Sequence, residues 1–212
     1  MTNAEKRPQA RSRAVFNAAA DHFDDTSFWE LVGGRTVELA GIGSGQRVLD
    51  VCCGSGASAL PAAAVVGSDG YVLGVDMAER LLDLGRSKAR ARGLEHLQFR
   101  VGDMLSLPAR NASFDVVLCV LGIFFVPDMV AALQELWRVV RPGGTLAITS
   151  WRGDSVLEPG SGIFWDAVQN ERPDLFEPTP LWDPIKDPSR LAALLRKAGL
   201  PEPAVAEETF DY

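Results

Sequence analysis

Short apolar runs that alternate with helical stretches place the strictest limit on how this chain can fold. Five such runs follow one another at residues 47–53, 71–77, 97–103, 114–122 and 144–151. Helical patterns occupy residues 57–66, 78–92 and 129–141 between them. Strands that are apolar on both faces and alternate with helices are typical of a parallel sheet covered on both sides. We therefore predict a doubly wound, Rossmann-like α/β fold, with a mostly parallel sheet and helices on both faces.

The N-terminal residues have a different pattern of apolar residues from that of the predicted strands. A helical pattern extends over residues 10–42, where the polar run 24–27 breaks it and Gly33 and Gly34 interrupt it. Aspartate, threonine and serine in that polar run are typical of the N-terminal cap of a second helix. We predict two helices or one bent helix, which form an N-terminal helical lid over residues 1–46.

Residues 47–212 are predicted to form the α/β unit on which this lid packs, so that the chain is one structural domain overall. The regular alternation stops at residue 151, and residues 152–188 are rich in proline, glycine and tryptophan. We interpret that stretch as an insertion in the domain. Beyond it, an amphipathic pattern predicts a helix at 191–198, and residues 204–212 are predicted to form a final strand.

Composition narrows the class of protein. The 212 residues are 47% apolar and 23% charged, which is ordinary for a soluble globular domain. A net charge of -7 argues against nucleic acid as a partner, because phosphate binding requires a basic face. No apolar run is long enough for a membrane span or a signal core. Three cysteines without metal-ligand spacing indicate a reduced, cytoplasmic protein with no metal site.

The segment 48–56 has the strongest functional signal. A buried strand runs into a turn that contains Gly54 and Gly56, and a helical pattern follows directly. Glycines in such a turn let the backbone approach a ligand, and the free N–H groups of the helix face it. The second strand ends in Asp76, where a carboxylate can accept hydrogen bonds from ribose hydroxyls. The third ends in Asp103, which could bind an adenine amino group. We predict a nucleotide-type cofactor site.

Asp50 discriminates between the two cofactor classes that use this geometry. The spacing from Gly54 through Gly56 to Ala59 formally matches the dinucleotide pattern, which on its own is weak. A carboxylate four residues ahead of Gly54 would repel a pyrophosphate and would attract a cationic amino group. S-adenosylmethionine (SAM) has an ammonium and a sulfonium and no phosphate. The site chemistry therefore favours SAM over NAD.

The ordered motifs resemble those of the class I SAM-dependent methyltransferases over roughly residues 47–151. The stretch 48–56 resembles motif I of that family, and 72–78 resembles its acidic second-strand motif. Residues 99–108 are similar to its adenine-binding segment, 113–117 to its fourth-strand motif, and 133–146 to the helix and turn before its fifth strand. The most similar subgroup is the ubiquinone/menaquinone-biosynthesis-like, small-molecule branch.

The resemblance implies that the turn after the first strand contacts the cofactor. Asp50 would organise the methionine amino group, often through water, and Gly54 and Gly56 would pass beneath the cofactor. Cys52 and Cys53 lie in the same turn and are included among the predicted cofactor-binding residues. Cys52 departs from the family, because many members have a glycine at this position.

Further roles are implied at the ends of the later strands. Asp76 would bind the ribose, and Met77 would pack on the adenine. Asp103 would bind the adenine amine with Met104 alongside, and Cys119 would contact the methionine part of SAM. The family usually ends in an antiparallel hairpin, of which one strand is evident here, so the C-terminal hairpin is predicted to be incomplete.

The reaction implied is in-line methyl transfer to oxygen, carbon or nitrogen of a small-molecule acceptor, with S-adenosylhomocysteine as the product. The sequence gives no convincing signal for a catalytic base. His22 is a weak candidate, because it lies on the predicted lid. Five aromatic residues could line an acceptor pocket: Trp29, Phe124, Phe125, Trp151 and Trp165.

Three questions stay open at this point. A non-catalytic SAM-binding module is one alternative to an enzyme. An NAD-type oxidoreductase is another, which Asp50 and the later motifs oppose. The oligomeric state is also open, with a homodimer as one option.

Overall fold

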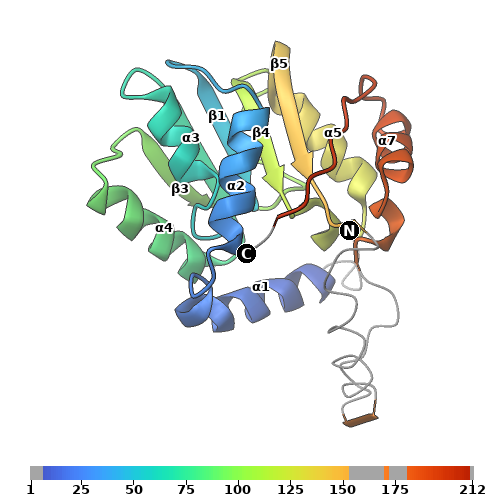
Figure 1. The fold of residues 1–212 in the computed structure, drawn as a ribbon, viewed down its shortest axis with the longest axis horizontal. Coiled ribbons are helices and arrows are strands. Elements are labelled where there is room, and N and C mark those ends of the chain that lie inside the picture. Colours follow the sequence, from blue (N-terminus) through green and yellow to red (C-terminus); the bar gives the residue numbers. More distant parts are fainter. Residues whose placement is uncertain (1–6, 153–169, 172–180, 211–212) are drawn as a thin grey trace.

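Five parallel strands form a single sheet in the order β3-β2-β1-β4-β5 (Figure 1). The structure is a computed structural model that describes residues 7–152, 170–171 and 181–210. The predicted doubly wound sheet is confirmed. Its strands are β1 (Arg47–Val51), β2 (Tyr71–Asp76), β3 (Leu97–Val101), β4 (Phe114–Val120) and β5 (Val140–Thr149).

Helices cover the sheet on both faces and enclose two apolar cores. The helices α2 (Phe28–Leu39), α3 (Ala59–Val66) and α4 (Glu79–Ala91) pack on one face. On the other face lie α5 (Met129–Val139) and α7 (Pro188–Lys197) (Figure 1). Strand side chains alternate between the two cores, which is why the runs are apolar throughout.

The order of the strands determines where a ligand can bind. The chain passes outward from β1 to β2 and β3 and then returns to place β4 on the other side of β1. The connections after β1 and β4 therefore leave the sheet in opposite directions. Such a reversal opens a crevice at the carboxyl ends of the strands, which is where doubly wound folds bind their ligands.

The N-terminal segment lies across those carboxyl ends (Figure 1). It consists of α1 (Arg7–Ala19) and a short 3₁₀ turn at Ala20–His22, and α2 begins at Phe28. The predicted break at residues 24–27 is confirmed. The predicted interruption at Gly33 and Gly34 is wrong, because both residues lie inside the continuous helix α2.

Gly33 is required for a close contact between two helices. A Cβ atom at this position would lie 2.5 Å from the carbonyl oxygen of Ala57 and 2.9 Å from the amide nitrogen of Ser58. The backbone of α2 therefore rests directly on the turn that leads into α3. Gly34, the next residue, has nothing within 4 Å of such an atom.

The C-terminal part of the chain differs from the prediction in two places. The helix predicted to reach residue 141 ends at Val139, and β5 begins at Val140, which pairs with Phe114 before the register shifts. The strand predicted at 204–212 is wrong over its described part, because residues 201–210 belong to no strand. Ion pairs hold this tail instead, from Glu208 to Arg35 and from Glu207 to Arg152.

The predicted insertion at 152–188 falls mostly outside the described residues. Of its described residues, Asp183–Ile185 form a 3₁₀ turn, and Trp182 packs against Phe124 and Trp151. In the described ranges, no helix is both long and apolar enough to cross a membrane.

Replacing Gly33 by alanine is expected to destabilise the protein by about 2 kcal/mol or more, because the methyl group would overlap backbone atoms that cannot move aside. Gly34→Ala is the matched control. There the added methyl meets open space, and alanine favours the helix by roughly 0.5–1 kcal/mol. Urea unfolding of both variants checks this, and equal stability of the two would contradict the contact.

Candidate functional site

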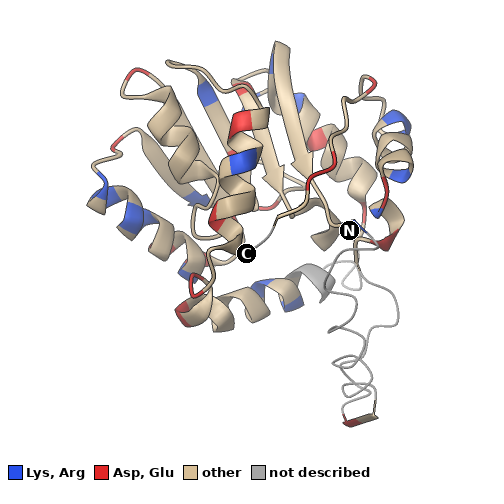
Figure 2. Cartoon of the chain, in the orientation of Figure 1, with Lys and Arg blue, Asp and Glu red and all other residues tan. Residues whose placement is uncertain are grey.

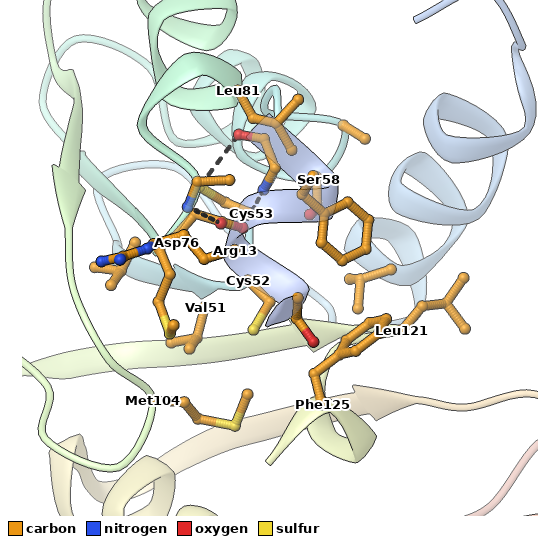
Figure 3. Close-up of a pocket in the computed structure, with 18 of the residues that line it drawn as sticks. Arg13, Val51, Cys52, Cys53, Ser58, Asp76, Leu81, Met104, Leu121 and Phe125 are labelled. Atoms are coloured by element: carbon orange, nitrogen blue, oxygen red, sulfur yellow. Dashed lines mark hydrogen bonds between the residues drawn. The ribbon is translucent and has the colours of Figure 1, made fainter. Parts of the chain in front are cut away.

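The turn after β1 is tied to the end of β2 by one carboxylate. Asp76 accepts a hydrogen bond from the amide of Gly54 at 2.9 Å through Oδ2 and one from the amide of Ala78 at 2.8 Å through Oδ1 (Figure 3). Burial raises the pKa of Asp76, and these two backbone hydrogen bonds oppose that rise. Asp76 therefore holds the glycine turn in place while its carboxylate lines the pocket.

The glycine turn needs unusual backbone conformations. Cys52, Gly54 and Gly56 have φ of 60°, 53° and 93°, all in the region that favours glycine. Gly54 lies under the ring of Phe23, where a Cβ would be 3.3 Å from the ring edge. Cys52 adopts this conformation with a side chain, which is an uncommon and mildly strained arrangement.

Asp50 lies behind the turn and does not line the pocket. It is fully buried in β1, and its Oδ2 accepts a hydrogen bond from Ser58 Oγ at 2.7 Å. Its other oxygen, Oδ1, has no hydrogen-bond partner in the described part of the chain. Burial raises the pKa of Asp50 to about 7, against the bonds from Ser58 and the backbone of Ala59. A buried carboxylate with one open oxygen fits a role in organising a cation or a bridging water.

The end of β3 delivers the second acidic residue to the pocket. Asp103 lines it, and the amide of Leu105 donates to Asp103 Oδ1 at 2.9 Å. Met104 is buried beside it and also lines the pocket, as does Met77 after β2. These three predicted residues, with Asp76, are thus brought to one wall.

The three cysteines divide between the pocket and the core. Cys52 and Cys53 line the pocket, while Cys119 is fully buried in β4 and does not. Val120 and Leu121 take the lining position that the prediction gave to Cys119. A hydrogen bond to Cys119 and burial raise the pKa of the Cys52 thiol. Gly56, like Cys119, is not among the lining residues.

His22 lies away from the pocket. Its side chain is 84% exposed, and Nδ1 is 2.9 Å from Asp25 Oδ2. The structure therefore does not bring this candidate base to the predicted site. Within the described ranges, no group of three or more histidine, cysteine, aspartate or glutamate residues could hold a metal ion.

Aromatic side chains form the wall that faces the glycine turn. Trp29, Phe124, Phe125 and Trp151 line the pocket, as the sequence suggested, while Trp165 lies outside the described residues. Sequence reasoning missed Ser12, Arg13, Phe16 and Phe23, which the N-terminal segment contributes. The seven-residue spacing of the two phenylalanines, which is two helical turns, is a signal that could have found them.

The rings of this wall contact one another. Phe16 meets Phe125 edge to face, with centroids 5.3 Å apart, and Phe23 stacks on Trp29 at 5.3 Å. Of the described lining residues outside the acidic wall and the cysteines, Arg13 is the one with an ionisable side chain. Figure 3 shows the carboxylate of Asp76 on one side of the pocket and the ring of Phe125 on the other.

Comparison with known proteins agrees with this geometry. Residues 48–144 match the methyltransferase domain family. A demethylmenaquinone methyltransferase of Anoxybacillus flavithermus is 34% identical over 146 residues, which cover 66% of this chain and 62% of that protein. The structure of a SAM-dependent methyltransferase of Aquifex aeolicus superposes with a TM-score of 0.67 at 21% identity and covers 86% of this chain and 87% of that one.

One solved structure with this fold has a different printed activity. The cyclase SpnF superposes with a TM-score of 0.53 at 28% identity, covering 57% of this chain and 44% of that one. The fold by itself therefore does not decide which reaction is catalysed.

A glycine turn and an acidic second-strand end at the switch point of a parallel sheet define the class of nucleotide-cofactor α/β domains. Within that class, residues 48–144 match the methyltransferase domain family, and the fold is the one seen in solved SAM-dependent methyltransferases. The chain spans 48–62% of the length of the curated relatives it matches.

The buried position of Asp50 predicts how stability depends on pH. Because its pKa is raised to about 7, the folded protein keeps a proton that the unfolded chain releases near pH 4, so stability is lost as pH rises between these values. Asp50→Asn removes this loss and is expected to stabilise the ligand-free protein at pH 8 by on the order of 1–3 kcal/mol relative to wild type, with a smaller effect at pH 5.

Thermal unfolding at both pH values measures the difference. The control is Asp69→Asn, which changes an exposed carboxylate and should follow the wild-type curve. If Asp50→Asn destabilised the protein equally at pH 5 and pH 8, the carboxylate would be ionised in the folded state and the assignment would be wrong.

Proposed function

We propose that this chain binds SAM in the described pocket and catalyses methyl transfer to a small, largely apolar acceptor. The observation that supports the proposal best is Asp76, a carboxylate fixed by Gly54 and Ala78 at the end of β2 and open to the pocket. A ribose diol can donate to its remaining lone pairs, because each carboxylate oxygen accepts more than one hydrogen bond.

The remaining groups fit the rest of SAM. The open oxygen of Asp50 lies behind the glycine turn, where it would organise the methionine ammonium through water. Asp103 and the two methionines beside the acidic wall would hold the adenine. Ionised carboxylates on this side favour a ligand with a positive charge over one with a pyrophosphate. An NAD-type oxidoreductase is disfavoured for this reason, because NAD has a pyrophosphate.

The chemistry left to the protein is mainly alignment. SAM supplies the activated methyl group on its sulfonium. The aromatic wall would place the acceptor on the opposite side and exclude water from the line of transfer. The lining residues described here include no histidine or lysine, and the two aspartates are committed to the cofactor. We therefore expect an acceptor whose nucleophile needs no strong protein base, such as an acidic hydroxyl or a carbon activated by one.

The acceptor is the least defined part of the proposal. The printed name of the Anoxybacillus relative makes demethylmenaquinone the first compound to test, because a flat apolar ring system fits an aromatic wall. We further propose a cytoplasmic location, which the three free cysteines support. A homodimer stays a prediction.

A second reading is a SAM-binding module without methyltransferase activity. This alternative is supported by the solved cyclase, which has a similar fold and a different printed activity. Calorimetric titration with SAM and with NAD separates the cofactor classes. Methyl transfer from radiolabelled SAM across a panel of quinols, phenols and amines separates enzyme from module. Binding of SAM with no transfer to any acceptor would support the module.

Asp76→Ala is expected to weaken SAM binding at least tenfold, because it removes both the ribose acceptor and the anchor of the glycine turn. Calorimetry on folded protein measures the affinity. Asp69→Ala is the matched control, since Asp69 is an exposed residue that does not line the pocket. Unchanged affinity for SAM in Asp76→Ala would refute the cofactor assignment.

A further inference from the structure

Lys88 lies outside the pocket and yet joins two segments that border it. Its Nζ is 2.8 Å from Asp24 Oδ2 and donates to Ser55 Oγ at 3.1 Å. Ser55 in turn donates to Asp24 Oδ1 at 2.6 Å. The three side chains form a closed triangle of polar contacts, which we call the latch.

Each member of the latch comes from a different element around the cofactor site. Asp24 lies in the break between the N-terminal segment and α2, and Ser55 lies between the two glycines of the turn after β1. Lys88 extends from the third turn of α4. Figure 2 shows acidic residues of the turn that follows α1 beside basic residues of α4. A single cation thus fixes the glycine turn and the N-terminal segment relative to each other.

Other contacts place the same segment over the pocket. The ring of Phe23 packs on Gly54, and Ala20 joins an apolar cluster with Ala78 and Leu81. Arg80, in the first turn of α4, donates to Asn17 and pairs with Asp21 at 2.6 Å. The latch adds an ion pair and side-chain hydrogen bonds to the apolar contact that Phe23 makes with the glycine turn.

Burial distinguishes the latch from an ordinary surface ion pair. Exposed pairs contribute little, because water and salt screen them. The side chain of Lys88 is 23% exposed, that of Asp24 is 35% exposed, and Ser55 is 1% exposed. Arg80 and Asp21, by comparison, are 51% and 71% exposed. The partly buried triangle is therefore expected to be the stronger attachment.

We propose that Lys88 is a positioning residue that holds the N-terminal segment closed on the glycine turn and thereby slows the release of bound cofactor and product. The inference rests on the proposed function, since that function places SAM beside the glycine turn. Lys88 touches neither ligand nor pocket and acts through Asp24 and Ser55. Its loss should change dissociation rates more than folding.

The first experiment measures dissociation of S-adenosylhomocysteine from the full chain by stopped-flow displacement. Lys88→Ala is expected to release the ligand about 5- to 20-fold faster than wild type, as for loss of a charged hydrogen-bonded contact. Lys88→Arg keeps the charge and should restore most of the effect. Arg90→Ala, two residues further along the same helix and exposed, is the matched control and should behave as wild type.

Salt and a second variant separate positioning from a general loss of stability. Raising ionic strength should accelerate release from wild type more than from Lys88→Ala, because that variant no longer has the ion pair. Asp24→Ala should have an effect similar to Lys88→Ala, and the double variant should be no faster than either alone. The inference would be overturned if the rate increases of the two single variants multiplied in the double variant. It would also be overturned if the unfolding temperature fell in proportion to the increase in release rate.

Limited trypsin digestion without ligand tests the same contact independently. Arg11 and Arg13 lie on α1, so cleavage there reports opening of the N-terminal segment. Faster cleavage in Lys88→Ala than in wild type and Arg90→Ala is the expected result, and equal rates would contradict the latch. If wild type bound no S-adenosylhomocysteine, the proposed function would fail, and digestion alone would decide the role of Lys88.

Discussion

The hydrogen bonds between Asp76 and the amides of Gly54 and Ala78 determine most of the site. The bond to Gly54 joins the ends of β1 and β2, beside the crevice that opens where the connections after β1 and β4 diverge. The turn after β1 requires positive φ at three positions, which the chain adopts only where surrounding contacts compensate the strain. The same carboxylate lines the pocket, so under the proposed function both the turn and cofactor binding would depend on one side chain.

Burial of acidic groups beside the glycine turn supports the proposed choice of a cationic cofactor. Asp50 and Asp76 both have raised pKa values because burial disfavours their charge. A cationic ligand relieves this cost, and an anionic one adds to it. Under the proposed function the acidic wall would favour a cationic cofactor, and the aromatic wall would recognise the acceptor by shape and apolar contact.

Much of the fold could be predicted from local sequence patterns, because the apolar runs of the strands and the helical spacing of apolar residues were both clear. The strands 47–51 and 71–76 are apolar on both faces, and the glycine turn after the first strand indicates where the strand order reverses. The predicted strand at 204–212 was wrong over its described part. Whether such a segment forms a strand depends on a neighbouring strand with which it can pair, and not only on its own residues. Sequence alone could likewise place Asp50 near the turn and could not decide whether its side chain faces the ligand or α3.

The sequence alone did not predict that the N-terminal segment lines the pocket, and the reason is related. Phe16 lies on α1 and Phe23 follows the 3₁₀ turn, and the packing of this segment against α4 brings both rings to the pocket. The sequence likewise did not predict the contacts of Lys88, whose run of basic neighbours is typical of a solvated helix face. Contacts over such sequence separations are set by tertiary structure, which a single sequence records only weakly.

The residues that line the pocket extend from position 12 to position 151, and they come from α1, α2 and α4 and from the strands or the segments that follow them. A molecule bound there touches nearly every layer of the domain at once. Its binding energy is consequently added to the cohesion of the whole fold, about 2.7 kcal/mol at a hundredfold excess over the dissociation constant. In a cell, the supply of ligand would then govern how long the protein survives, and not only how fast it works.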